Sequence, residues 1–193
     1  MTSNYSQLSI NPLSSNQIAV TITYLEQTER PTLNMPPAPS FGSRRKTALM
    51  RVEKTPIHFY RYLYDLVGAP FNWVSRVTMN DEDLAAILHD DEVYFYVLYV
   101  GGAPAGLAEI DARDQKSHEL KFFGLAPDFT GMGLGRYFIT NILDLAWSRG
   151  PERLRLETCT LDHPAALPLY QKFGFQVVDR RKGFVERLAP KDN

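Results

Sequence analysis

The chain has 193 residues, of which 44% are hydrophobic and 22% charged, and its formal net charge is −1. This length and apolar content suffice for one well-buried domain, whereas the lack of a basic surplus argues against nucleic-acid binding. No apolar run approaches the roughly 20 residues that span a bilayer, and the first residues lack the basic and apolar regions of a signal peptide. The lone cysteine, Cys159, fits a reducing compartment. We therefore expect a cytoplasmic protein that binds neither membranes nor nucleic acids.

The N-terminal part divides into a tail, a strand and an arm. Residues 1–16 are polar and are expected to form a flexible tail outside a single domain of residues 17–193. Within residues 17–45, residues 18–25 alternate as in a strand, and the remainder carries four prolines and one glycine, which predict an extended arm. Residues 46–54 alternate again and predict the first strand of the main sheet.

Two helices are predicted next. Residues 55–67 begin with Thr55 and Pro56 and end before Gly68, which are typical helix start and stop signals. Apolar and aromatic residues recur there at helical spacing, which favours a core face over a pocket: Phe59, Tyr60, Leu63, Tyr64 and Val67. Residues 80–88 begin with a capping asparagine and an acidic first turn, so they predict a second helix.

The following pattern predicts a hairpin and, at the C-terminal end, two short strands. Residues 92–100 and 105–111 are strand-like runs joined by a tight glycine turn. Residues 175–179 and 184–188 resemble short strands around a Lys-Gly pair. Strands and helices that alternate in this mixed order predict an α/β or α+β fold with a mixed sheet.

The segment between residues 118 and 136 carries the most information about function. A strand-like run ends at Pro127, three alternate glycines follow, and Arg136 opens a helical pattern. A strand, a glycine turn and a helix in that order gather backbone N–H groups and the positive end of a helix dipole, which favours an anion such as phosphate. Glycines leave the main chain open to close approach by a ligand.

Two common nucleotide motifs do not fit this segment. A P-loop needs Gly, four residues and then Gly-Lys-Ser/Thr, and no such string occurs. A dinucleotide fingerprint needs G-x-G-x-x-G, and here the third glycine, Gly135, comes one place early. A nucleotide-binding protein that uses the turn for ATP or NAD is therefore disfavoured.

The residues downstream extend the pattern. Residues 153–160 predict a strand, and a helical segment then ends Leu169-Tyr170-Gln-Lys-Phe-Gly174-Phe175. With the glycine turn, this resembles the GNAT superfamily of N-acetyltransferases, whose pyrophosphate motif is Arg/Gln-x-x-Gly-x-Gly/Ala and whose second hallmark is Leu-Tyr-x-x-x-Gly-Phe. The resemblance covers roughly residues 92–180, about half the chain. Thr130 stands where the motif has Arg or Gln, so we expect weaker anchoring at that position.

The resemblance implies a mixed sheet that is splayed open in the middle and flanked by helices. It also implies acetyl-CoA as the co-substrate, with no metal. The residues that would bind the coenzyme lie on the strand end, the glycine turn and the helix entry: Phe123, Gly124, Leu125, Thr130, Gly131, Met132, Gly133, Leu134, Gly135, Arg136 and His163. His163 occupies a position where many members carry a coenzyme-contacting asparagine, although it also reads as a helix-entry residue before a proline.

Amide formation from a thioester needs a base for the amine and help for the departing thiolate. The resemblance places a base at Glu119 or at Glu157, and Glu109 is a further acidic residue on a nearby strand. Either glutamate could instead be a solvated carboxylate in a surface ion pair. His118 has a suitable pKa, but strand alternation turns it away from the face of Glu119.

The superfamily's tyrosine position is occupied by Tyr170, which the resemblance makes a proton donor to the thiolate. The alternative is a half-buried tyrosine whose hydroxyl binds a backbone group. Cys159 invites an acyl-enzyme hypothesis, but its apolar strand context favours a small core residue.

For the acceptor, Phe71, Trp73 and Arg76 follow the first helix outside its helical period, and Arg76 could hold an acceptor carboxylate or lie on the surface. The sequence thus predicts an N-acetyltransferase acting on the primary amine of a small molecule by direct attack in a ternary complex. A protein or peptide acetyltransferase and a catalytically silent coenzyme A-binding sensor are the alternatives. The acceptor's identity and the formation of a homodimer are left open.

Overall fold

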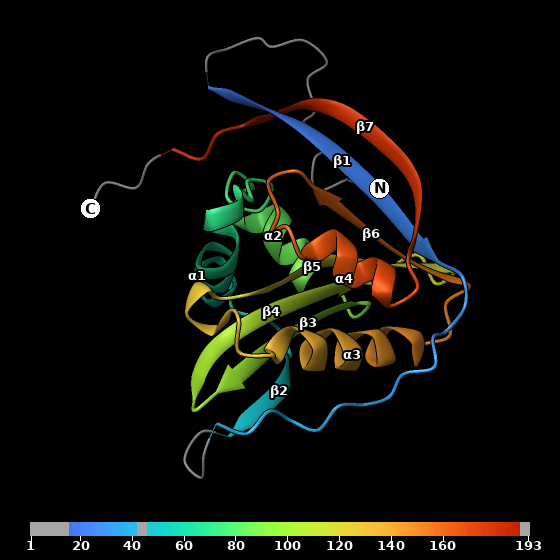
Figure 1. Cartoon of the computed structure of the whole chain (residues 1–193). Helices are drawn as coiled ribbons and strands as arrows, with labels where there is room; N and C mark the ends of the chain where they lie inside the picture. Colours follow the sequence, from blue (N-terminus) through green and yellow to red (C-terminus); the bar gives the residue numbers. More distant parts are fainter. Residues whose placement is uncertain (1–15, 42–45, 190–193) are drawn as a thin grey trace.

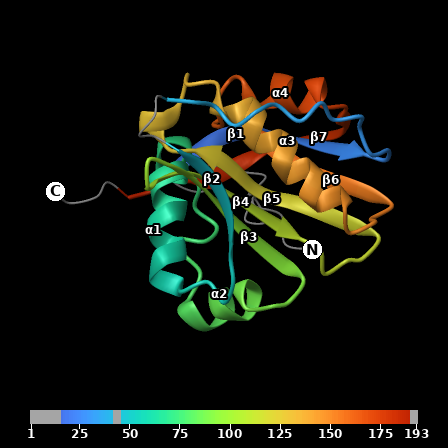
Figure 2. The ribbon, with the colours of Figure 1, turned by 90° about the horizontal axis from the view of Figure 1, so that it is seen from below.

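The architecture is a seven-stranded sheet with helices on both faces (Figures 1 and 2). The computed structural model describes residues 16–41 and 46–189, so the expected tail lies almost wholly outside the described residues. In chain order the elements are β1 (Gln17–Gln27), β2 (Thr47–Val52), α1 (Ile57–Gly68), a 3-10 turn (Ala69–Phe71), α2 (Asp81–Leu88), β3 (Val93–Val100), β4 (Ala103–Asp111), β5 (Ser117–Leu125), a second 3-10 turn (Pro127–Phe129), α3 (Leu134–Trp147), β6 (Arg153–Cys159), α4 (Ala166–Lys172) and β7 (Gln176–Glu186).

The strands run in the order β2-β3-β4-β5-β6-β1-β7, and only β5 and β6 are parallel neighbours. Their parallel pairing is short, since it joins only Ser117–Glu119 to Arg153–Arg155. Beyond these residues both strands continue without pairing to each other. The sheet is therefore mixed and open between β5 and β6, as the sequence predicts.

Two apolar cores lie on the opposite faces of the sheet. The larger packs α3 and α4 against the sheet, and the smaller packs α1 and α2 (Figure 2). Tyr60, Leu63, Tyr64 and Val67 of α1 are buried, as the helical spacing predicts. Cys159 lies in a third small cluster with Val20, Ile22 and Val185, which fits the interpretation of this thiol as a core residue.

The N-terminal strand has a position that the sequence does not predict. β1 lies inside the sheet, antiparallel to β6 on one side and to β7 on the other (Figure 1). Residues 28–41 then cross the outer side of α3 as an extended segment, where Arg30 forms an ion pair with Asp144 at 2.6 Å. The proline-rich arm is thus extended as expected. It leads from β1, next to one edge of the sheet, to β2 at the opposite edge.

One expectation about the C-terminal part is wrong. Instead of two short strands, Gln176–Glu186 form a single strand, β7. The presumed turn residues Lys182 and Gly183 pair with Thr21 and Val20 of β1. Because the neighbouring strand supplies partners along the whole length, tertiary pairing overrides the local turn signal.

Candidate functional site

The glycine turn forms a concave backbone surface at the start of α3. Gly131 and Gly133 have φ values of 73° and 75°, a left-handed conformation that favours glycine. Gly133 precedes α3 and no side chain caps the first turn. A Cβ built on Gly131, Gly133 or Gly135 would meet no atom within 4 Å, so this surface faces open space. Uncapped N–H groups at a helix N-terminus, facing open space, suit an anionic ligand.

A cavity of about 240 Å³ extends from this turn into the gap between β5 and β6. Its walls include most of the predicted coenzyme residues and part of the predicted acceptor site: Phe123, Gly124, Leu125, Thr130, Gly131, Gly133, Leu134, Gly135, His163, Phe71 and Trp73. The candidate catalytic residues Tyr170 and Glu157 also line it. The structure therefore brings together, at one cavity, residues that are nearly 100 positions apart in the chain.

Four predicted site residues do not line this cavity. Met132 and Arg136 belong to the glycine turn and the first turn of α3 but are not among the lining residues. Glu119 accepts a hydrogen bond from the Lys121 ammonium at 2.9 Å, and it is Lys121 that lines the cavity. Arg76 is buried in an ion pair with Glu109.

Tyr170 presents a protonated hydroxyl to the cavity. The residue is only 7% exposed, and its ring packs edge-on against Phe123 and Phe175. Burial, together with the nearby Asp162 carboxylate, raises the pKa of Tyr170 well above its usual value of about 10. No other described residue hydrogen-bonds with this hydroxyl, so the O–H is available to donate to a ligand.

Asp162 is a cavity-lining residue that the sequence analysis does not single out. One of its carboxylate oxygens accepts from the Trp73 indole at 3.2 Å, and the other accepts from the Thr158 hydroxyl and the Cys159 N–H at 2.7 and 2.8 Å. Asp162 therefore connects the β6–α4 turn to the aromatic loop after α1. An aspartate just after a strand is a common turn former, and that signal could have identified the turn but not the contact with Trp73.

His163 continues the same wall. Its Nδ1 accepts a hydrogen bond from the Ala165 N–H at 3.1 Å, and its ring contacts Phe71 at a centroid distance of 6.3 Å. Because Nδ1 is the acceptor, the neutral ring carries its proton on Nε2. His163 is thus a helix-entry residue as well as a cavity residue with one N–H donor.

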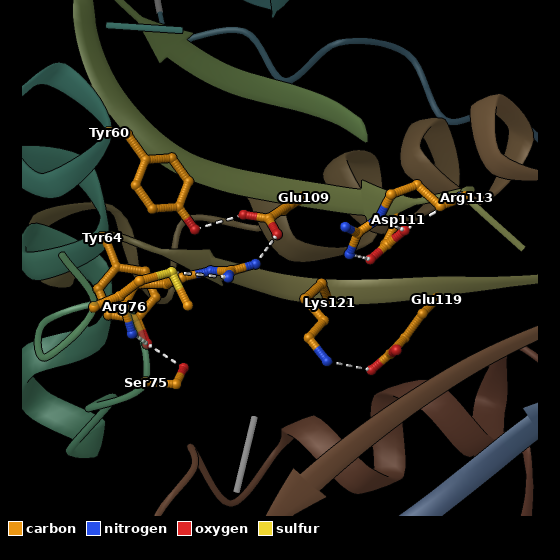
Figure 3. Close-up of polar contacts among 10 residues, drawn as sticks. Tyr60, Tyr64, Ser75, Arg76, Glu109, Asp111, Arg113, Glu119 and Lys121 are labelled. Atoms are coloured by element: carbon orange, nitrogen blue, oxygen red, sulfur yellow. Dashed lines mark hydrogen bonds and ion pairs between the residues drawn. The ribbon is translucent and has the colours of Figure 1, made fainter. Parts of the chain in front are cut away.

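Lys121 owes its position to an irregularity in β5. Pairing with β4 passes from Leu120 to Phe122, so Lys121 is the extra residue of a bulge. The bulge puts Leu120 in the α3 core and Phe122 in the α1 core, on opposite faces. The side chain of Lys121 is 6% exposed, and Figure 3 shows it beside Glu119 on the same strand.

On the same strand, His118 is buried, and burial lowers its pKa. It contacts the backbone of Ala146 in α3, whereas Glu119 points to the other face. The alternation predicted for these two neighbours is therefore observed.

A buried ion pair lies next to the segment whose residues Val74 and Ser75 line the cavity (Figure 3). The Arg76 guanidinium donates to Glu109 at 2.6 Å, and the Tyr60 hydroxyl donates to the other oxygen of Glu109 at 2.5 Å. Glu109 is fully buried and Arg76 is 5% exposed. Burial, and after it the negative charge of Glu109, raise the pKa of Tyr60 well above its usual value. Arg76 thus acts within the fold here, and the Glu109 carboxylate is committed to it.

The described residues contain no cluster of three or more His, Cys, Asp or Glu side chains that could hold a metal ion. None of the helices in the described part of the chain is long and apolar enough to cross a membrane.

Comparisons with known proteins agree on one family. A model of the acetyltransferase (GNAT) family matches residues 60–175. N-alpha-acetyltransferase 50 of Danio rerio is 25% identical over 122 residues, which are 60% of this chain and 70% of that protein. The uncharacterized N-acetyltransferase YedL of Escherichia coli (strain K12) is 34% identical over 89 residues, which are 46% of this chain and 56% of that protein. The match thus spans little more than half of YedL.

The fold is also that of solved acetyltransferases. The aminoglycoside acetyltransferase meta-AAC0020, from an uncultured soil metagenomic sample, superposes with a TM-score of 0.55 at 17% identity, covering 69% of this chain and 93% of that chain. An identity this low shows a shared fold and nothing finer. The predicted fold class, a mixed sheet flanked by helices, is confirmed.

The buried ion pair yields a stability prediction. Glu109→Gln keeps the shape of the side chain but leaves the Arg76 charge buried without a counter-charge, which we expect to cost about 3–5 kcal/mol of unfolding free energy. Glu152→Gln is the matched control, because Glu152 pairs with Lys116 on the surface and such pairs contribute about 0–1 kcal/mol. Urea denaturation measures both, and equal midpoints for the two variants would contradict the assignment.

Proposed function

Because this chain belongs to the acetyltransferase (GNAT) family, we propose that it transfers an acetyl group from acetyl-CoA to the primary amine of a small molecule. The observation that carries the proposal is the single cavity that joins the glycine turn, the open edge of β5, Tyr170 and the aromatic loop after α1. The pyrophosphate of the coenzyme would bind the N–H groups of the glycine turn. Its arm would follow β5 toward Gly124 and Leu125, and the thioester would lie near Tyr170.

The chemistry would proceed by direct attack in a ternary complex. A carboxylate removes a proton from the acceptor ammonium, and the amine nitrogen attacks the thioester carbonyl carbon to form the C–N bond. Backbone N–H groups of β5 stabilise the oxyanion. The C–S bond then breaks and Tyr170 donates its proton to the departing thiolate. The nitrogen, positively charged after its attack, releases its second proton, which restores the Tyr170 hydroxyl by way of solvent. The raised pKa of Tyr170 keeps this proton in place at neutral and moderately alkaline pH.

For the base we favour Glu157 over Glu119. Glu157 lines the cavity from β6, whereas Glu119 holds Lys121 and does not line it. A base must come within hydrogen-bond reach of the proton that it removes, directly or through one water. In this arrangement Glu119 acts on the site through Lys121.

A protein N-terminus is the second candidate acceptor. The observation that favours it is the likeness to N-alpha-acetyltransferase 50 of Danio rerio. Peptides therefore belong in any screen of acceptors beside small amines.

The direct test is a thiol-release assay with acetyl-CoA and a panel of amines, amino acids and peptides. We expect release that depends on an added amine, and loss of coenzyme binding in Gly135→Val. This residue lies in the first turn of α3, where its Cβ would point into open space, so the change should obstruct the ligand and spare the fold. Calorimetry with coenzyme A and thermal unfolding measure the two effects. Tight binding of ATP in preference to coenzyme A would contradict the proposal, and binding without turnover would indicate a sensor.

Tyr170→Phe separates a catalytic hydroxyl from a packing ring. A positioned proton donor contributes about 10²–10⁴-fold in rate, and we expect the low end because a thiolate leaves readily. Coenzyme binding should stay near wild type, since the pyrophosphate contacts lie elsewhere. If turnover of the folded variant equals that of wild type, Tyr170 is only a core residue.

Glu157→Gln and Glu119→Gln identify the base. With Glu157 as base, its replacement lowers the rate about 10²–10⁴-fold at neutral pH, and the deficit shrinks as pH rises because more of the amine is already deprotonated. Glu119→Gln should cause a smaller loss. The measurement is kcat/KM across pH for both variants, and a Glu157→Gln deficit that does not vary with pH would exclude Glu157 as the base.

A further inference from the structure

The cavity that we assign to the coenzyme and the acceptor has one cationic side chain in its described wall. Among the described residues that line it, Lys121 alone is a lysine or arginine, and the acidic residues are Glu157 and Asp162. Asp162 uses both oxygens to hold Trp73 and the β6–α4 turn. Lys121 and Glu157 are the other two charged side chains among the described residues of the wall.

These two residues flank the opening of the sheet from opposite sides. The last parallel pair between the strands is Glu119 with Arg155. Lys121 and Glu157 each lie two residues farther along, on β5 and β6, where the strands have parted, and both line the cavity. A positive and a negative group thus stand on the two strands that border the cavity.

The position of Lys121 is costly for a side chain that only makes a surface ion pair. Its side chain is 6% exposed, whereas that of Lys116, which pairs with Glu152, is 77% exposed. Most of the other lining residues are apolar or aromatic. Phe71 is one of them, and Trp73 and Tyr64 pack against Phe122, the residue after the β5 bulge. A charge next to apolar walls interacts more strongly with an opposite charge than it would in water.

The geometry points to an acceptor that carries a carboxylate as well as the amine: we infer that the substrate is a free α-amino acid with an apolar or aromatic side chain. Lys121 binds its carboxylate, and Glu157 faces its ammonium. This inference rests on the function proposed above. An acceptor with several ammonium groups would instead bring like charge to Lys121, and a peptide N-terminus has no carboxylate on the same carbon.

The test compares L-phenylalanine with L-phenylalaninamide, and L-leucine with L-leucinamide, in the thiol-release assay with the full chain. In each protein, kcat/KM is measured for the acid and for the amide. The acid-to-amide ratio of these values is then compared between wild type and Lys121→Met. The acid and the amide also differ in the basicity of their amines. This difference is the same for both proteins, so it cancels when their ratios are compared. We expect a fall of about 10- to 100-fold, the worth of one hydrogen bond to a charged group. Lys121→Arg should retain most of the ratio, and Lys116→Met, on the surface, should retain all of it.

Each outcome separates the inference from the function on which it rests. An acid-to-amide ratio that is the same in wild type and Lys121→Met overturns the inference, as does a wild type that acetylates other amines but neither amino acid. No turnover with any amine, despite coenzyme binding, overturns the proposed function itself. If Lys121→Met does not fold, product inhibition of wild type decides: N-acetyl-L-phenylalanine should compete better than its amide, and equal competition overturns the inference.

Discussion

The short parallel pairing between β5 and β6 is the constraint on which the site depends. These strands share only three residue pairs before they part, and the cavity begins where the pairing ends. Backbone N–H and C=O groups on that edge of β5 lack a strand partner, and such groups favour a ligand that can bind them. Aromatic packing holds the gap open from both faces, with Phe122 against Tyr64 and Trp73 on one side and Phe123 against Phe138 on the other.

The N-terminal strand fixes the far side of this gap. β1 pairs with β6 along Ile22–Gln27, so β6 keeps its place although it leaves β5 early. At the end of β1, the buried Gln27 accepts from the Trp147 indole at 2.7 Å and donates to the Phe173 carbonyl at 2.5 Å. One side chain therefore joins the end of α3 to the end of α4. The helix that starts at the glycine turn and the helix that carries Tyr170 are connected through the strand at the beginning of the chain.

Local signals in the sequence were sufficient for most elements and for the chemistry of the turn. The three alternate glycines predict a backbone surface that is open to a ligand, and α3 begins at Leu134, within two residues of the expected position. The capping asparagine Asn80 accepts from the Asp83 N–H as its position predicts. These features depend on residues close together in the chain, so they can be predicted without knowledge of the fold.

Features that depend on distant residues could not be derived in this way. The buried position of Arg76, in the loop after α1, follows from its ion pair with the fully buried Glu109 of β4, and nothing near Arg76 in the sequence indicates that partner. The bulge at Lys121 is a property of the pairing with β4, and it changes which side chains of β5 reach the cavity. Likewise, the continuous β7 exists because β1 lies beside it.

The buried pair of Arg76 and Glu109 is better understood as a positioning device than as a source of stability. Well-packed apolar residues of similar volume often stabilise a protein as much as a buried ion pair does. An apolar pair, however, has no hydrogen bonds to fix the relative orientation of its side chains. Arg76 must meet Glu109 and the ring of Phe122 together, and its backbone N–H approaches the Tyr64 hydroxyl at 3.4 Å. These contacts fix the segment just before Arg76, where Val74 and Ser75 line the cavity, so the pair gives this part of the cavity wall a defined shape.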